Sequence, residues 1–252
     1  MEITQITTNG YKMNIRVPVG FQDTKVIHEV IASDTYGFEE LKHLNPSVVL
    51  DIGGHIGSFG VLARTHWPDC KLIAFEPCKV SAELYEKNLR DNGLYDVNKT
   101  IVLNKAVSYD KACNCLVNSP TSTGGHVLRK KVEAEQYVLE QYRWYSEIQD
   151  EVEVVTIEDV CDEFDIDVID FAKWDCEGGE VDAFNNMSDE CASKFRFMAG
   201  EYHLWDETTR YLKPSKFECI QFWRRVKKKF PNLYWNYKEN ALGLFQARPK
   251  DF

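Results

Sequence analysis

Residues 48–58 decide the fold. This stretch, Val48-Val-Leu-Asp-Ile-Gly-Gly-His-Ile-Gly-Ser58, joins a short apolar run to a glycine-rich turn and the start of a helix-like segment. A continuous apolar run of this kind is typical of a parallel strand that is buried on both faces. Glycines in a strand-to-helix turn permit positive φ and let a ligand lie against the backbone. The stretch therefore predicts a βα unit with a ligand crevice at the carboxyl end of its strand.

The glycine spacing and the neighbouring acids indicate which ligand this turn binds. A dinucleotide fingerprint requires Gly-x-Gly-x-x-Gly, but counting from Gly53 the second glycine position holds His55. Asp51 stands where a pyrophosphate would approach, and its carboxylate would repel a diphosphate. The charge instead suits a ligand that is cationic at that point, such as S-adenosylmethionine. Glu76 ends the next apolar run, 25 residues after Asp51, and a carboxylate there accepts hydrogen bonds from ribose hydroxyls.

Outward from this turn, apolar strand-like runs alternate with helix-like stretches, which is the βαβ pattern of an α/β fold. The right-handed crossover rule then places helices on both faces of a mostly parallel sheet. Two further runs near the C-terminus, separated by only a few residues, must be antiparallel. The expected strands are 48–51, 71–75, 101–103, 168–172, 195–201, 232–237 and 241–247, and the expected helices are 57–66, 79–92, 157–164 and 215–229.

We expect one domain over residues 1–252, because no linker-like composition divides the chain. Residues 1–44 form an N-terminal extension of this domain. Residues 118–150, approximately, interrupt the α/β pattern and predict an insertion whose main element is a helix over 129–148. Its Gly-Gly pair predicts a hinge, so we expect the insertion to cover the acceptor. Residues 151–156 alternate like an edge strand.

Charge and composition exclude several kinds of partner. The net charge of −10 disfavours nucleic acid and anionic membranes. No window approaches 18 uninterrupted apolar residues, and the N-terminus has no basic stretch followed by an apolar core. We therefore expect a soluble cytoplasmic protein. The eight cysteines include no Cys-x-x-Cys pair, which predicts reduced, buried thiols.

Several motifs resemble the FkbM family of S-adenosylmethionine-dependent methyltransferases. They are Val48–Ser58, Ala74–Pro77, Asn88–Gly93, Asn104–Ser108, Val154–Asp159 and Ile169–Glu180, in this order over roughly residues 45–201. The first two are shared by many class I methyltransferases, whereas Lys173-Trp-Asp-Cys-Glu-Gly178 is far more specific to the family. The resemblance implies a Rossmann-like class I fold, with a mostly parallel seven-stranded sheet that ends in an antiparallel hairpin.

The resemblance also implies a set of cofactor contacts. The residues expected at the methionine end of the cofactor share the glycine turn, those at the ribose follow the next strand, and two apolar residues lie near the adenine. In that order they are Asp51, Gly53, Gly54, Gly57 and Ser58, then Glu76 and Pro77, then Ala106 and Val107. Asp175 is expected to face the cofactor ammonium.

Candidate catalytic residues follow two neighbouring strands. Lys173, Asp175 and Glu177 alternate at the end of one strand, and so share a face that points toward the crevice. Glu201 and His203 end the next strand, at the same edge of a parallel sheet. A hydroxyl acceptor must lose its proton near the transition state, and we expect His203 to be the base. Alternatively, Asp175, Glu177, Glu201 and His203 ligate a divalent cation that lowers the pKa of the acceptor hydroxyl.

The sequence thus predicts methyl transfer from S-adenosylmethionine, most directly to a hydroxyl oxygen of a small molecule or glycan. An amine nitrogen is the nearer alternative acceptor. A nucleotide-binding or NAD-dependent Rossmann protein is a different class, and the failed glycine spacing argues against it.

Overall fold

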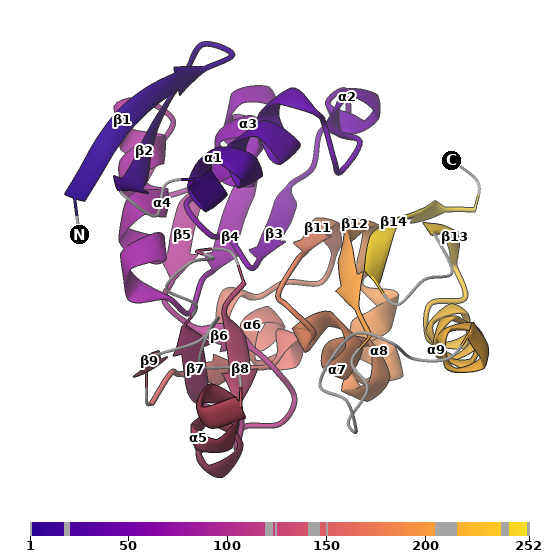
Figure 1. The fold of residues 1–252 in the computed structure, drawn as a ribbon. Coiled ribbons are helices and arrows are strands. Elements are labelled where there is room, and N and C mark those ends of the chain that lie inside the picture. The colour runs from indigo at the N-terminus through magenta and orange to yellow at the C-terminus, as the bar shows by residue number, and fades with distance from the viewer. Residues whose placement is uncertain are drawn as a thin grey trace.

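The computed structural model describes residues 2–17, 21–118, 123, 125–140, 147–149, 151–204, 216–237 and 242–250. Its centre is a seven-stranded sheet with the strand order β13-β14-β12-β11-β3-β4-β5 (Figure 1). In chain order these strands are β3 (Val48–Ile52), β4 (Lys71–Phe75), β5 (Thr100–Leu103), β11 (Ile169–Trp174), β12 (Phe195–His203), β13 (Leu233–Tyr237) and β14 (Leu242–Pro249).

The pairing of these strands confirms the expected fold class. Strands β5, β4, β3, β11 and β12 are parallel, so their carboxyl ends meet at one edge. Strand β14 is antiparallel to β12 and β13 is antiparallel to β14, which gives the expected C-terminal hairpin. The order of the parallel strands reverses between β3 and β11, and ligands of open α/β sheets bind at such a switch point.

Helices cover both faces of the sheet, because alternate residues of each buried strand point to opposite sides. Leu50 and Ile52 of β3 pack on one face, whereas Val49 packs on the other. The first face carries α6 (Ile157–Phe164), α7 (Gly179–Asn186), α8 (Asp189–Ser193) and α9 (Lys216–Lys229). The second face carries α3 (Ser58–His66) and α4 (Lys79–Asp91), together with α1 (Phe21–Ile27), η1 (His28–Ala32) and α2 (Phe38–Leu41).

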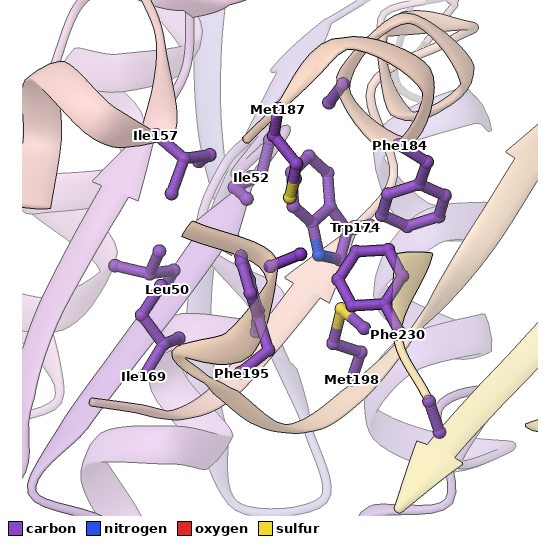
Figure 2. Close-up of a cluster of buried hydrophobic side chains, with 14 of the residues drawn as sticks. Leu50, Ile52, Ile157, Ile169, Trp174, Phe184, Met187, Phe195, Met198 and Phe230 are labelled. Carbon is purple, nitrogen blue, oxygen red and sulfur yellow. The ribbon is translucent and has the colours of Figure 1, made fainter. Parts of the chain in front are cut away.

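The core on the first face is rich in aromatic side chains. Figure 2 shows Trp174 of β11 among Phe184, Met187 and Phe230. The rings of Trp174 and Phe184 pack edge to face, with centroids 5.1 Å apart. Such ring pairs stabilise the fold beyond the contribution of the apolar area that they bury. This packing fixes the end of β11, and therefore the position of the residues that follow it.

The N-terminal segment belongs to the same hydrophobic core. Strands β1 (Glu2–Thr8) and β2 (Tyr11–Val17) form a hairpin beside α4 (Figure 1). Met13 and Ile15 of β2 and Ile27 of α1 are buried in the cluster on the second face. The side chain of Asn14 donates a hydrogen bond of 2.8 Å to that of Asn88. The segment therefore packs as part of the α/β core.

The insertion differs from the expected long helix. Helix α5 spans only Lys131–Glu140, and β8 (Val127–Arg129) and β9 (Glu147–Gln149) pair with β7 (Cys115–Asn118) in an antiparallel sheet. The prediction of a helix over 129–148 is confirmed over Lys131–Glu140 and wrong at its two ends, because Arg129 and Ile148 belong to strands that pair with β7, which the polarity of the segment alone did not reveal. Residues 119–122, 124, 141–146 and 150 of the insertion lie outside the described residues.

Two other features complete the chain. The predicted edge strand over 151–156 is shorter in the structure, where β10 (Val154–Val155) pairs in parallel with β6 (Ala106–Val107). The eight cysteines are thiols, and six of them are buried. Among the described residues, no helix has the length and apolar character needed to cross a membrane.

Candidate active site

The glycine turn after β3 lies against the end of β11. Gly53 has φ 77° and its N–H donates to the carbonyl oxygen of Phe75 at 3.0 Å. A Cβ at this position would lie 1.7 Å from the backbone oxygen of Asp175. Only glycine fits there, because the backbone conformation is left-handed and the neighbouring chain leaves no room. The turn therefore brings β3, β4 and the end of β11 together.

Two other glycines of the motif serve packing instead. A Cβ on Gly54 or Gly57 would meet the ring of Tyr85, at 2.8 Å and 2.9 Å respectively. Gly57 has φ 86° and precedes α3, whose first residue, Ser58, is 3% exposed. None of these three residues lines the cavity described below. They shape the turn from behind, and their contacts with the cofactor stay a prediction.

The carboxylate of Glu76 closes the turn on the other side. Its Oε2 accepts the N–H of His55 at 2.8 Å, and its Oε1 accepts the N–H of Cys78 at 2.8 Å. Burial raises the pKa of Glu76. Each oxygen accepts one backbone hydrogen bond and has a second lone pair free for a ribose hydroxyl. This geometry fits the expected ribose contact.

A cavity of about 650 Å³ opens along the carboxyl edge of the sheet, within the range of about 300–1,000 Å³ that is usual for small-ligand sites. Six of the predicted cofactor residues line it: Gly53, Glu76, Pro77, Ala106, Val107 and Asp175. The predicted residues Glu177 and Glu201 line it as well. The cavity thus connects the predicted nucleoside contacts with two of the predicted catalytic or metal-binding residues.

Asp51 and Lys173 lie behind the cavity wall as a buried ion pair. Asp51 is fully buried, its Oδ2 accepts the hydroxyl of Tyr85 at 2.8 Å, and its Oδ1 lies 3.4 Å from Nζ of Lys173. Nζ also donates to the carbonyl oxygen of Gly53. Burial lowers the pKa of Lys173, but the charge of Asp51 outweighs this effect and raises it. The pair holds the glycine turn in place, whereas the carboxylate of Asp175 lines the cavity.

An acidic cluster with one histidine stands at the ends of β11 and β12. Asp175 Oδ2 accepts the hydroxyl of Tyr36 at 2.7 Å. Nε2 of His203 lies 3.6 Å from Oε2 of Glu177 and 3.8 Å from Oε2 of Glu201. The structure therefore brings together all four residues of the alternative metal set. Nζ of Lys173 lies 4.0 Å from Oδ2 of Asp175 and 3.4 Å from Oδ1 of Asp51, so Lys173 stands between the cluster and the buried Asp51.

The charges of this cluster argue against His203 as the base. Burial alone would lower the pKa of His203, but the charge and hydrogen bond of Glu180 raise it to about 10. The imidazole is then protonated at neutral pH and cannot accept a proton. Burial raises the pKa of Glu177 and of Glu201 to about 7 in each case. With a pKa of about 7, each of these carboxylates is able to accept a proton at neutral pH, and the identity of the catalytic base stays a prediction.

Three contributors to the site have no local signal in the sequence. Tyr36 reaches Asp175 from 139 residues away. Glu180 is fully buried and accepts Nδ1–H of His203 at 2.8 Å. Its place in the Gly-Gly-Glu180 motif marked it as part of the family pattern without showing its partner. Arg16 lies 2.8 Å from Nε2 of His55, which ties the glycine turn to the N-terminal hairpin.

The two ends of the cavity have different walls. The insertion packs beside the nucleoside contacts, since Leu116 and Ala106 share a hydrophobic cluster. Tyr36 and Glu29 of the N-terminal segment stand near the acidic cluster, where Glu29 contributes to the raised pKa of Glu201. Among the described residues, the wall nearest the acidic cluster thus includes the N-terminal segment.

Comparison with known proteins agrees with this geometry. A family model described as Methyltransferase FkbM domain matches residues 51–224. "Methyltransferase 1" of Beauveria bassiana (strain ARSEF 2860) is 22% identical over 182 residues, which cover 69% of this chain and 71% of that protein. "Methyltransferase sdnD" of Sordaria araneosa is 25% identical over 192 residues, which cover 66% of this chain and 69% of that protein.

A solved structure shares the fold. The S-adenosylmethionine-dependent methyltransferase from Agrobacterium tumefaciens superimposes with a TM-score of 0.52 at 10% identity, over 99% of this chain and 70% of that one. The family match runs from Asp51 to α9 and so spans the glycine turn, Glu76 and the acidic cluster. The chain is an S-adenosylmethionine-dependent methyltransferase and belongs to the FkbM methyltransferase family.

Proposed function

We propose that the chain transfers the methyl group of S-adenosylmethionine to a hydroxyl oxygen of a small molecule or glycan. The observation that carries this proposal is the position of Glu177. Its carboxylate lines the cavity at the acidic end, and its backbone has φ 52°, an uncommon conformation for a residue other than glycine. Strained residues of this kind cluster at functional sites. A carboxylate held there is placed to accept the proton that a hydroxyl releases.

The residues of the cavity fit the cofactor. The oxygens of Glu76 bind the ribose hydroxyls, and Asp175 offers a carboxylate to the ammonium group. When bound, the cofactor supplies a methyl group on a sulfonium, which is already activated for displacement. The acceptor oxygen forms a bond to the methyl carbon as the carbon–sulfur bond breaks, and the electron pair remains on sulfur. Glu177 takes the hydroxyl proton, so the products are the methyl ether and S-adenosylhomocysteine.

The test begins with pools of hydroxyl compounds and glycans, incubated with the protein and methyl-labelled S-adenosylmethionine. Mass spectrometry identifies the labelled product. With that acceptor, Glu177→Gln should lower kcat by about 10²–10⁴-fold, because a positioned base typically contributes that much. The affinity for S-adenosylhomocysteine should stay within about twofold. Normal turnover in this variant would refute the role of Glu177, and failure of the wild type to bind S-adenosylhomocysteine would refute the proposal itself.

A specific observation also favours an amine as a second candidate acceptor. The cavity is acidic, with the carboxylates of Asp175, Asp182 and Glu201 on its wall in addition to Glu177. Such a wall attracts a cationic molecule. A protonated amine must lose a proton before it attacks, so Glu177 would serve both reactions. Fragmentation of the labelled product distinguishes a methyl group on nitrogen from one on oxygen.

A further inference from the structure

We propose that Tyr36 is a positioning residue, which holds the carboxylate of Asp175 in place for the ammonium group of the cofactor. Asp175 follows β11 and lines the cavity, and the hydroxyl of Tyr36 donates to its Oδ2 at 2.7 Å. The inference rests on the proposed function, because that function places the carboxylate of Asp175 at the ammonium group. It adds a residue of the N-terminal segment to the cofactor site.

The carboxylate of Asp175 depends on Tyr36 for its orientation. The Asp175 side chain is 27% exposed, and among the described residues no other group donates a hydrogen bond to it. Nζ of Lys173 lies 4.0 Å from its Oδ2, which is too long for a hydrogen bond. A carboxylate that turns freely must be ordered when a ligand binds, and this ordering lowers the affinity. The contact with Tyr36 orders the carboxylate before the cofactor binds.

The hydroxyl of Tyr36 keeps its proton and therefore always donates. Burial, together with the charge of Asp175, raises the pKa of Tyr36 well above its usual value. An ionised carboxylate can only accept hydrogen bonds, and each of its oxygens has two lone pairs. Because the hydroxyl binds Oδ2, the other oxygen of Asp175 is left for the N–H groups of an ammonium ion.

Tyr36 is itself fixed by contacts on two sides. It is 5% exposed, and its ring packs edge to face on that of Phe59, with centroids 6.2 Å apart. Its carbonyl oxygen accepts the side-chain N–H of Gln246, on β14, at 3.1 Å. The next residue, Gly37, has φ 70°, and a Cβ there would lie 2.0 Å from Nε2 of Gln246. The residue is therefore anchored between α3 and β14, and its hydroxyl can hold a partner in place.

Tyr36 acts from outside the part of the chain that the family model covers. That model matches residues 51–224, which include Asp175. Tyr36 lines the cavity together with Glu29 and Val30 of the same N-terminal segment. The orientation of a carboxylate in the matched region thus depends on a segment that precedes it in the chain.

The test compares two ligands by calorimetry with the full chain. S-adenosylhomocysteine carries the ammonium group, whereas 5′-methylthioadenosine keeps the nucleoside and the thioether but lacks the whole amino-acid end. Tyr36→Phe keeps the ring on Phe59 and removes only the hydroxyl. It should weaken S-adenosylhomocysteine binding by about 3–10-fold, which is the scale of ordering one side chain. The affinity for 5′-methylthioadenosine should stay within about twofold.

A double-mutant cycle identifies the residue through which Tyr36 acts. Asp175→Ala should weaken S-adenosylhomocysteine binding at least about tenfold, because it removes the carboxylate. Adding Tyr36→Phe should then weaken binding by less than about twofold more, since the group that Tyr36 holds is absent. The matched control is Tyr109→Phe, which removes a tyrosine hydroxyl from the carboxylate of Glu158. Neither is among the described residues that line the cavity, so the affinity should stay within about twofold.

Several results would overturn the inference. Unchanged S-adenosylhomocysteine affinity in Tyr36→Phe, beside weakened binding in Asp175→Ala, would exclude the role of Tyr36 and leave the proposed function intact. Equal weakening of both ligands by Tyr36→Phe would indicate general damage to the cavity. A full further loss in the double variant would show that Tyr36 acts independently of Asp175. Unchanged affinity in Asp175→Ala would refute the ammonium contact itself. Circular dichroism shows whether each variant is folded.

Discussion

Replacing Gly53 by alanine tests the close contact between the glycine turn and β11. The new Cβ would lie 1.7 Å from the backbone oxygen of Asp175, a separation that real atoms cannot adopt. The turn must therefore move away from β11. That movement strains the hydrogen bond of 3.0 Å between Asp175 N–H and the carbonyl oxygen of Ile52, and the contact of Lys173 with Gly53. The same movement displaces the floor of the cofactor cavity.

Three contributions set the loss in the free energy of unfolding that we expect for Gly53→Ala. Left-handed backbone costs an alanine about 1–2 kcal/mol, of which about 0.4–1 kcal/mol is offset because alanine restricts the unfolded chain. Overpacking adds about 1–3 kcal/mol, and a weakened buried hydrogen bond adds about 0.5–1.5 kcal/mol. We therefore expect Gly53→Ala to lower the free energy of unfolding by about 2–5 kcal/mol, and to weaken S-adenosylhomocysteine binding at least about tenfold.

Gly93→Ala is the matched control. Gly93 has φ 69° but a Cβ there would have no atom within 4 Å, so only the backbone contribution applies. Its cost should be about 1 kcal/mol, without any effect on cofactor binding. Urea denaturation and calorimetry measure the two quantities. The reasoning fails if both variants lose equal stability and both bind the cofactor normally.

Three further predictions follow from buried charges. Lys173→Met should lower the free energy of unfolding by about 3–5 kcal/mol, because it leaves the charge of Asp51 uncompensated. Adding Asp51→Asn should restore part of this loss in urea denaturation. No recovery in the double variant would contradict the ion pair. Burial alone would raise the pKa of Asp23, but hydrogen bonds with His55 and Arg16 hold it well below its usual value. The contribution of Asp23 to stability is therefore complete above about pH 4 and is lost as the pH falls. The thermal unfolding temperature of Asp23→Asn should depend less on pH below about 4 than that of the wild type. Parallel curves for the two proteins would refute this contribution. Glu76→Gln should weaken S-adenosylhomocysteine binding by about 10–100-fold, since hydrogen bonds to a charged group contribute about 1.5–3 kcal/mol, and unchanged affinity in calorimetry would remove Glu76 from the cofactor site.

Much of the fold could be predicted because the signals are local. Apolar runs and glycine turns follow from backbone and side-chain preferences within a few residues, so β3, α3, β4 and α4 begin and end close to the expected positions. The insertion could not be predicted in this way. Strand β9 pairs with β7 across the intervening helix α5, and mixed polarity does not distinguish a short helix from an edge strand.

The candidate site could also be predicted only in part. The sequence by itself determined that Asp175, Glu177, Glu201 and His203 lie at the ends of neighbouring parallel strands and so meet at one edge, because parallel strands bring their carboxyl ends to the same side of the sheet. It also determined the acid after the second strand, Glu76, which lines the cavity.

Only the tertiary structure decided what each charge does. The place of Asp51 at a strand end predicts a ligand residue. In the structure, Tyr85 and Lys173 contact its carboxylate, which is fully buried. The place of His203 predicts a base. In the structure, Glu180 contacts its ring and raises its pKa. Burial and the charge of distant neighbours set these roles, and both depend on contacts between residues far apart in the chain.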